Sequence, residues 1–474
     1  MSQNESSETS KADEQTVLKR SATNIIKVRD DKEPLVFTAN DDGSFKFEGD
    51  SSASWAAKPE SITQKELRAH VEPWLTSLFQ SEHLSLLAGS GLTHAVHLLA
   101  AGKSAAGMNA LSLKSHADKI NAEAAKSAKA AGREKNNLED QLRVANELLR
   151  GLEILEDAST EALRTELEAG MGEFAKSILT SENGIVSAEN AKRENAFNTL
   201  VTFLMSFASR TGIRDRLSIF STNYDRLIEA GAELAGLHLL DRFLGTLMPI
   251  FRSSRLDLDM HYNPPGIRGE PRYLEGVARF TKLHGSVDWV QIGADIRRIG
   301  LPFGASDVDP FLKVPGLEGA TAHELMIYPN AAKDRETAAY PYVELFRDFA
   351  AAVCRPNSTL LTYGYSFGDE HINRVIRDML TIPSTHLVVI SYSDDLGRIM
   401  QTYKNVGRSP QISLLIGPAL ADLTTLTENY LPKAAIDRTT FRMSELLKQR
   451  WGTQQHSTKV SDNDSSTSDG SALA

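Results

Sequence analysis

The most constraining feature of the sequence is a series of short apolar runs, each followed by small or polar residues and then by helical spacing. Apolar residues at neighbouring positions over about six residues are typical of strands buried on both faces. Strands that alternate with helices predict an α/β fold with a Rossmann-like, doubly wound parallel sheet. The runs lie at residues 83–88, before and at Ile219 and Phe220, and at residues 360–363, 386–390 and 412–416.

A long segment after the first run, from about residue 103 to 209, is rich in Ala, Glu, Lys and Leu and has no strand pattern. Apolar residues recur in it at spacings of three and four, which is typical of an amphipathic helix. We predict a large helical insertion here, acting either as a subdomain packed on the sheet or as a self-association surface. The recurring residues are Leu138, Leu142, Ala145, Leu148, Leu152 and Leu155.

The two ends of the chain are more polar than its centre. Residues 1–60 are rich in Ser, Asp, Glu and Lys, and we expect a peripheral N-terminal arm with one hairpin over residues 36–47. Residues 452–474 contain almost no large apolar side chain, so we expect a disordered tail.

Charge and hydropathy limit the partners of the chain. The chain has 52 Lys and Arg residues against 62 Asp and Glu, a net charge of −10 at pH 7. Proteins that bind nucleic acid usually have the opposite sign, so direct nucleic-acid binding is not expected. The first residues are too polar for a signal peptide, and apolar windows such as residues 84–101 are too short and polar to cross a membrane. We therefore expect a cytoplasmic protein without a membrane partner.

Cys354 is the only cysteine of the chain. One thiol cannot form an intrachain disulfide or a zinc site built on two or four thiolates. No metal is therefore expected.

The first candidate motif is the turn Gly89–Ser90–Gly91, which follows a predicted strand and precedes a helix expected from about Thr93. Glycines at such a turn let the backbone approach a pyrophosphate, and a helix start supplies free N–H groups. The same residues also form ordinary tight connections between a strand and a helix. Taken alone, the motif leaves both interpretations open.

Two further motifs follow predicted strands. Asn223 and Asp225 lie at the carboxyl end of the second run, where parallel sheets bind ligands, although both residue types also cap helices. His284 lies between an apolar strand and Gly285. An imidazole with its ordinary pKa of about 6.5 can take a proton from water or a ribose hydroxyl near neutral pH, whereas a lone histidine is more often structural.

Together, these motifs resemble those of the sirtuin family. Sirtuins carry a Gly-Ala-Gly-Ile-Ser type loop, a Thr-Gln-Asn-Ile-Asp segment and a Leu-His-Gly segment. Residues 89–93, 221–225 and 283–285 occupy those places here, in the same order. The resemblance covers about residues 80–440 and implies an NAD-binding catalytic domain.

The resemblance also implies roles for individual residues. Gly89, Gly91 and Thr93 would hold the NAD phosphates, and Asn223 and Asp225 would face the nicotinamide ribose and carboxamide. His284 would be the catalytic base. Ala88 and Tyr224, which belong to the same motifs, are expected to line the NAD site.

The loop that begins at Gly364 resembles the third nucleotide-binding turn of the family. As a ligand site, Gly364, Tyr365, Ser366 and Asp369 would contact the adenosine ribose or the diphosphate. As structure, Gly368 forms a turn and Asp369 caps the next helix, and the two roles are compatible. The Tyr328–Pro329–Asn330 loop is predicted to be structural.

The chain departs from protein-deacylating sirtuins because one cysteine cannot build their four-cysteine zinc module. Its motifs look instead like the sirtuin-like domains of bacterial anti-phage defence systems. That resemblance implies an NAD hydrolase that cleaves NAD to nicotinamide and ADP-ribose and depletes the infected cell of NAD. Alternatives are a non-catalytic sensor of NAD or an ADP-ribose-type signal, and a protein deacylase.

The same resemblance implies partners. Members of this group assemble into homo-oligomers or pair with a HerA-like hexameric ATPase. The chain has no Gly-x-x-x-x-Gly-Lys-Ser/Thr loop, so an ATPase activity would have to come from such a partner.

Overall fold

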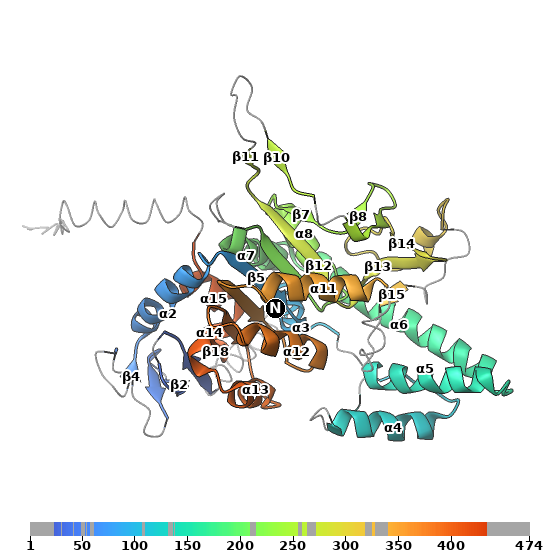
Figure 1. Cartoon of the computed structure of the whole chain (residues 1–474), viewed down its shortest axis with the longest axis horizontal. Helices are drawn as coiled ribbons and strands as arrows, with labels where there is room; N and C mark the ends of the chain where they lie inside the picture. Colours follow the sequence, from blue (N-terminus) through green and yellow to red (C-terminus); the bar gives the residue numbers. More distant parts are fainter. Residues whose placement is uncertain are drawn as a thin grey trace, which may run out of the picture. The chain divides into compact units, whose positions relative to one another are not determined.

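The alternating apolar runs fold into one mixed sheet, which Figure 1 shows in a computed structural model of the chain. The structure describes residues 23–29, 31–40, 42–48, 53, 55–56, 61–106, 110–130, 136, 138–208, 215–254, 258–262, 272–317, 325–327 and 340–433. Residues up to Pro432 form one unit. The predicted tail over 452–474 and the Tyr328–Pro329–Asn330 loop lie outside the described residues.

Parallel strands form the main part of this sheet. Their order is β18-β17-β16-β5-β6-β12-β7, and each neighbouring pair is parallel. The order reverses between β5 and β16, which makes this pair the switch point where doubly wound sheets bind ligands. The predicted Rossmann-like α/β fold is confirmed. The strands are β5 (His83–Ala88), β6 (Leu217–Ser221), β7 (His238–Leu240), β12 (Val277–Lys282), β16 (Ser358–Tyr363), β17 (His386–Ser391) and β18 (Ile412–Ile416).

Four antiparallel strands from the N-terminal segment extend the sheet at β18. Ile25 lies opposite Ile416, and the predicted hairpin forms with Phe37 opposite Phe47. Phe37 is fully buried and its ring contacts the rings of Phe45 and Phe47. These strands therefore cover an edge of the parallel sheet that would otherwise present unpaired backbone groups. They are β1 (Asn24–Lys27), β2 (Leu35–Ala39), β3 (Phe45–Phe47) and β4 (Ser61–Ile62).

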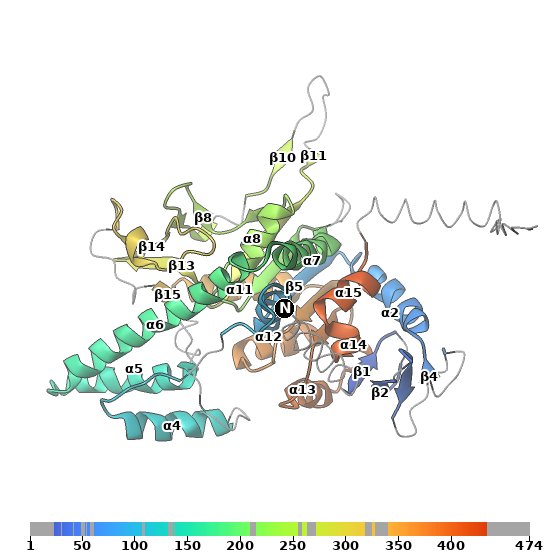
Figure 2. The same cartoon turned by 180° about the vertical axis from the view of Figure 1, so that it is seen from behind.

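Helices cover both faces of the parallel sheet. Side chains alternate along each strand, so Leu86 of β5 joins one apolar core and Leu87 joins the other. The first core contains α2 (Gln64–Leu78), α3 (Ser90–Ala101), α7 (Asn190–Ala208), α8 (Leu227–Leu234), α14 (Pro418–Ala421) and α15 (Leu423–Asn429). The second contains α11 (Tyr342–Val353), α12 (Glu370–Leu380) and α13 (Arg398–Val406), and Figures 1 and 2 show the arrangement from opposite sides.

The segment predicted as a helical insertion contains α4 (Ala117–Ala130), α5 (Leu138–Ile154), α6 (Thr160–Val186) and α7. The predicted stripe on α5 is buried at Leu138, Leu142, Ala145 and Leu152, whereas Leu155 follows the helix and is 76% exposed. Gly184 of α6 lies so close to α3 that a Cβ there would be 2.8 Å from His97 Nε2. Thus α6 packs against the helix that begins at the Gly89 turn.

A second sheet, which the sequence did not predict, begins directly after His284. Its order is β15-β13-β14-β9-β8, and a separate hairpin pairs β10 with β11. Gly285 is the first residue of β13, so His284 lies in the short connection between the two sheets. No helix in the described part of the chain is both long and apolar enough to cross a membrane. The remaining elements are β8 (Phe243–Leu244), β9 (Ile250–Phe251), β10 (His261–Tyr262), β11 (Arg272–Tyr273), β13 (Gly285–Ile292), β14 (Asp295–Arg298), β15 (Leu325–Ile327), α9 (Asp309–Leu312) and the 3₁₀-helix η3 (Ser409–Gln411).

Three glycines bring the loops after β5 and β16 into backbone contact. The Gly91 N–H donates to Gly364 O over 3.0 Å. A Cβ on Gly91 would lie 2.5 Å from Gly364 Cα, and a Cβ on Gly89 would lie 2.5 Å from Gly364 O. Gly364 also has a φ of +61°, which disfavours any residue with a side chain. Glycine is therefore required at the switch point for steric as well as conformational reasons.

We expect Gly364→Ala to lower the free energy of unfolding more than the matched change Gly407→Ala. Gly407 has a φ of +62°, and a Cβ there would have no atom within 4 Å. Left-handed backbone strain therefore destabilises both variants by about 1–2 kcal/mol. Only Gly364→Ala must also open the contact with Gly91, at a further cost of about 1–3 kcal/mol. Urea unfolding of the two variants measures the difference, and equal losses would contradict the contact.

Candidate functional site

A cavity of about 340 Å³ lies at the carboxyl ends of β5, β6, β12 and β16. All but two of the residues predicted for the site line it. Ala88 is fully buried at the end of β5, and Gly91 is the second residue of α3. The predicted residues at the cavity are Gly89, Thr93, Asn223, Tyr224, Asp225, His284, Gly364, Tyr365, Ser366 and Asp369.

Asn223 joins the first two motifs. Its side-chain amide donates to Gly89 O over 3.0 Å and to Thr93 Oγ1 over 2.9 Å. Thr93 Oγ1 in turn donates to Asp225 Oδ2 over 2.7 Å. The remaining oxygen of Asp225 accepts from the Leu227 N–H at the start of α8 over 3.1 Å, so the helix-capping interpretation also holds for this residue. The chain of bonds fixes Asn223 at the cavity wall, 8% exposed.

His284 forms a buried pair with Asp369. The distance from His284 Nε2 to Asp369 Oδ2 is 2.8 Å, and both side chains are less than a tenth exposed. Asp369 Oδ1 accepts from the His371 N–H over 3.1 Å, so Asp369 caps α12 as predicted and also contacts the histidine, which was not predicted. A carboxylate in this position orients an imidazole and stabilises the positive charge that the ring acquires with a proton.

A protein-family model matches the part of the chain that carries all of these motifs except the Gly89 turn. The SIR2-like domain model matches residues 217–407. This range begins with β6 and contains Asn223, His284 and the Gly364 loop, whereas the Gly89 turn precedes it. The match supports a sirtuin-like family and NAD-related enzymatic activity in general, since SIR2-like domains use NAD as a substrate. No curated protein matches the chain.

Tyr224 lies between the sheet and the helical segment. Its ring meets the Phe174 ring edge-on at 5.6 Å and lies 6.2 Å from the His284 ring. Burial raises the pKa of Tyr224 well above its ordinary value, and the nearby Glu139 acts in the same direction. The Tyr224 hydroxyl is therefore neutral at physiological pH.

Tyr365 stabilises the Gly364 loop rather than presenting a free polar group. Its hydroxyl contacts Asp369 O at 3.1 Å and Asn373 Oδ1 at 3.0 Å. Burial raises the pKa of Tyr365 well above its ordinary value, with Asp369 contributing. This bonding holds the first turn of α12, and with it Asp369, next to His284.

The helical segment supplies one wall of the cavity, which the sequence analysis did not predict. Glu139 comes from α5, and Phe174, Ser177 and Ile178 come from α6. Helical periodicity identifies an apolar stripe on a helix, but it does not identify the element that the stripe packs against. No local sequence pattern therefore indicates that α5 and α6 line the cavity. The other lining residues missed were Ser90, His94, Ala105, Ala106, Thr222, Gly368, Leu396 and Arg398.

His94 adds a neutral imidazole to the cavity. Burial lowers its pKa, and His97 lowers it further, while Asp225 opposes both. His94 follows Thr93 in the first half of α3, and its Nδ1 is buried without a hydrogen-bond partner in the described part of the chain. At neutral pH His94 therefore lines the site without adding charge.

Cys354, the only cysteine, is not among the residues that line the cavity. Cys354 lies at the end of α11, where its Sγ is 3.7 Å from Val375 O, and one thiol cannot form a four-thiolate zinc site. Among the described residues, no three His, Cys, Asp or Glu side chains gather as a metal-binding group.

A buried ion pair fixes the cavity wall to the second motif. Glu182 of α6 accepts from Arg226 N over 2.8 Å and from Arg226 Nε over 3.2 Å, and their side chains are 2% and 7% exposed. Burial raises the pKa of Glu182, although the adjacent Arg226 opposes this effect. Because Arg226 directly follows Asp225, the pair holds α6 against the site.

We expect Glu182→Ala to lower the free energy of unfolding by about 3–5 kcal/mol, because it leaves the Arg226 charge buried without its partner. Glu189→Ala is the control, since Glu189 pairs with Lys192 on the surface, where the two side chains are 67% and 59% exposed. Chemical denaturation of both variants measures the difference. A Glu182→Ala protein as stable as the control would show that the pair does not anchor α6.

Proposed function

We propose that this chain is an NAD glycohydrolase, which cleaves NAD to nicotinamide and ADP-ribose. The observation that carries the proposal is the buried His284–Asp369 pair, which shares with Asn223 a cavity at the switch point of the sheet. A sensor that only binds NAD has little need of a histidine and carboxylate pair beside the scissile bond. The SIR2-like match supports NAD as the substrate.

The diphosphate of NAD fits best at the start of α3. The N–H groups of Gly89 and Gly91 donate to Tyr363 O and Gly364 O over 3.0 Å each, so these amides are already used. The two glycines contribute instead by lacking side chains, which lets a ligand approach the backbone. Ser90 lines the cavity as the first residue of α3, where the helix dipole favours a negative charge.

Hydrolysis breaks the bond between ribose C1′ and the nicotinamide nitrogen. Nicotinamide leaves with the bonding electrons, and the positive charge that develops on the ribose is met by a water oxygen, which forms the new bond to C1′. The water proton passes to His284, directly or through a ribose hydroxyl, and Asp369 stabilises the charged ring.

Asn223 has a positioning role in this reaction. Its amide N–H groups are held by Gly89 O and Thr93 Oγ1, so the side chain has a fixed orientation. Its Oδ1 makes no hydrogen bond among the described residues and remains able to accept one from a ribose hydroxyl or the attacking water. Holding the reactants in this way lowers the entropic part of the barrier.

We further propose that the activity serves anti-phage defence by depleting NAD in the cytoplasm of an infected cell. The residue sequences of the motifs resemble those of sirtuin-like domains in bacterial defence systems, which supports this role. Ungated NAD hydrolysis would harm the host, so we propose control by homo-oligomer formation or by a HerA-like ATPase partner.

We expect His284→Ala to abolish nicotinamide release from NAD, since the water proton then has no acceptor. Asp369→Asn should slow release by a factor on the order of 10²–10⁴, because the amide no longer stabilises the charged imidazole. His238→Ala, an exposed histidine at the start of β7, is the matched control and should keep the parent rate. Chromatography of nicotinamide and ADP-ribose, with and without a candidate ATPase, measures all four proteins.

Two results would contradict the proposal. A His284→Ala protein that cleaves NAD at the parent rate would exclude this residue as the base. A parent protein that binds NAD tightly but never cleaves it, alone or with the ATPase, would favour the sensor function.

A further inference from the structure

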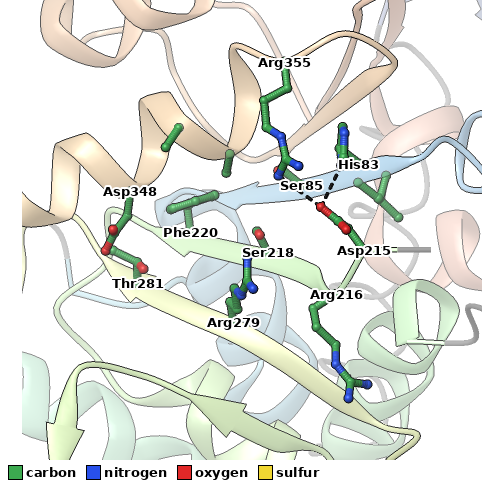
Figure 3. A pocket seen from close by; sticks show the side chains of 13 residues that line it. His83, Ser85, Asp215, Arg216, Ser218, Phe220, Arg279, Thr281, Asp348 and Arg355 are labelled. Atoms are coloured by element: carbon green, nitrogen blue, oxygen red, sulfur yellow. Dashed lines mark ion pairs between the residues drawn. The ribbon is translucent and has the colours of Figure 1, made fainter. Parts of the chain in front are cut away.

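A second cavity, of about 270 Å³, lies at the opposite edge of the parallel sheet (Figure 3). It is lined by residues of β5, β6 and β12 and is covered by α11, which contributes Asp348, Ala351 and Ala352. The first cavity lies at the carboxyl ends of these strands. The two cavities therefore share strands but not lining residues.

The sheet presents an unusual polar row to this second cavity. Ser85 of β5 lies in register with Ser218 of β6, and Ser218 lies in register with Arg279 of β12. Residues two positions further along the strands, Leu87 and Phe220, belong to the apolar core that includes α11. Sheet faces covered by helices are normally continuous apolar surfaces, so a polar row here needs an explanation.

The hydroxyl groups at this cavity have no partner within the described residues. Ser85, Ser218 and Thr281 are 3%, 8% and 4% exposed, and none of their side chains forms a hydrogen bond there. Buried hydroxyls are nearly always hydrogen-bonded, to protein or to a bound molecule. These three therefore form a set of donors that faces a volume open to a ligand.

Arg279 is a cation without a counterion in the described part of the chain. Its guanidinium forms no ion pair there, and its Nε is buried without a hydrogen bond. The other charged residues at the cavity are paired: Asp215 with His83 at 2.8 Å and Arg355 at 3.0 Å, Asp348 with Arg242 at 2.7 Å, and Arg216 with Asp259 at 3.0 Å. Figure 3 shows Arg279 below Ser218, apart from the pairs around Asp215.

We propose that this cavity is a binding site for a small oxyanion, a phosphate or carboxylate group, held by Arg279 and by the hydroxyls of Ser85, Ser218 and Thr281. Arg279 is half-buried with a fully buried Nε, and a charge that is partly removed from water is costly without a counterion. The guanidinium fork matches the oxygens of either group. The volume equals that of about nine water molecules, which admits the anion with a short organic substituent. The site does not depend on the proposed NAD hydrolysis.

Isothermal titration with inorganic phosphate and, separately, with acetate at constant ionic strength tests the proposal. We expect Arg279→Gln to weaken binding of the preferred anion at least tenfold, while Arg68→Gln, which removes an arginine on α2, leaves it unchanged. Ser218→Ala removes only a hydroxyl and should weaken the same anion several-fold, so it serves as the second variant if Arg279→Gln does not fold.

Each outcome is decisive. Preference for phosphate or for acetate identifies the group that the site accepts. Binding of neither anion to the parent protein, or equal binding to the parent and both variants, would overturn the proposal.

Discussion

The backbone contact between Gly91 and Gly364 is the constraint on which the rest of the site depends. It joins the loops after β5 and β16 at the point where the chain order of the sheet reverses. With a side chain at either position the loops would separate, and α3 and α12 would start in different places. Asn223 depends on the same contact, because it donates to the carbonyl of Gly89. The cavity therefore owes its shape to three residues without side chains.

The candidate base and the residue that orients it come from opposite sides of this switch point. His284 follows β12, whereas Asp369 caps α12 after the Gly364 loop, so their 2.8 Å contact requires both halves of the sheet to be in place. The helical segment then closes the cavity through α5 and α6, and the Arg226–Glu182 pair holds it there. This architecture makes the site sensitive to the position of α6.

The features predicted from the sequence are those that depend on local residue patterns, namely the strands and the motifs at their ends. The buried runs at β5 and β18 have the expected bounds, and the glycine and polar motifs lie at strand ends as periodicity and parallel-sheet topology require. It did not predict the contact between His284 and Asp369, which are 85 residues apart, or the helical wall around Phe174. The second sheet was missed because strands such as β8 and β9 have two residues each, too few for a period. No sequence motif indicated the second cavity, because Arg279 and Ser218 become neighbours only through the register of β12 and β6.

The most direct test of this account is a crystal structure of the His284→Ala protein with NAD, which can bind the substrate without consuming it. The account predicts the diphosphate at the start of α3 beside Ser90, and the nicotinamide ribose next to Asn223 and the space left by the imidazole. NAD bound outside the cavity between β5 and β16, or with its ribose turned away from Asn223, would contradict it.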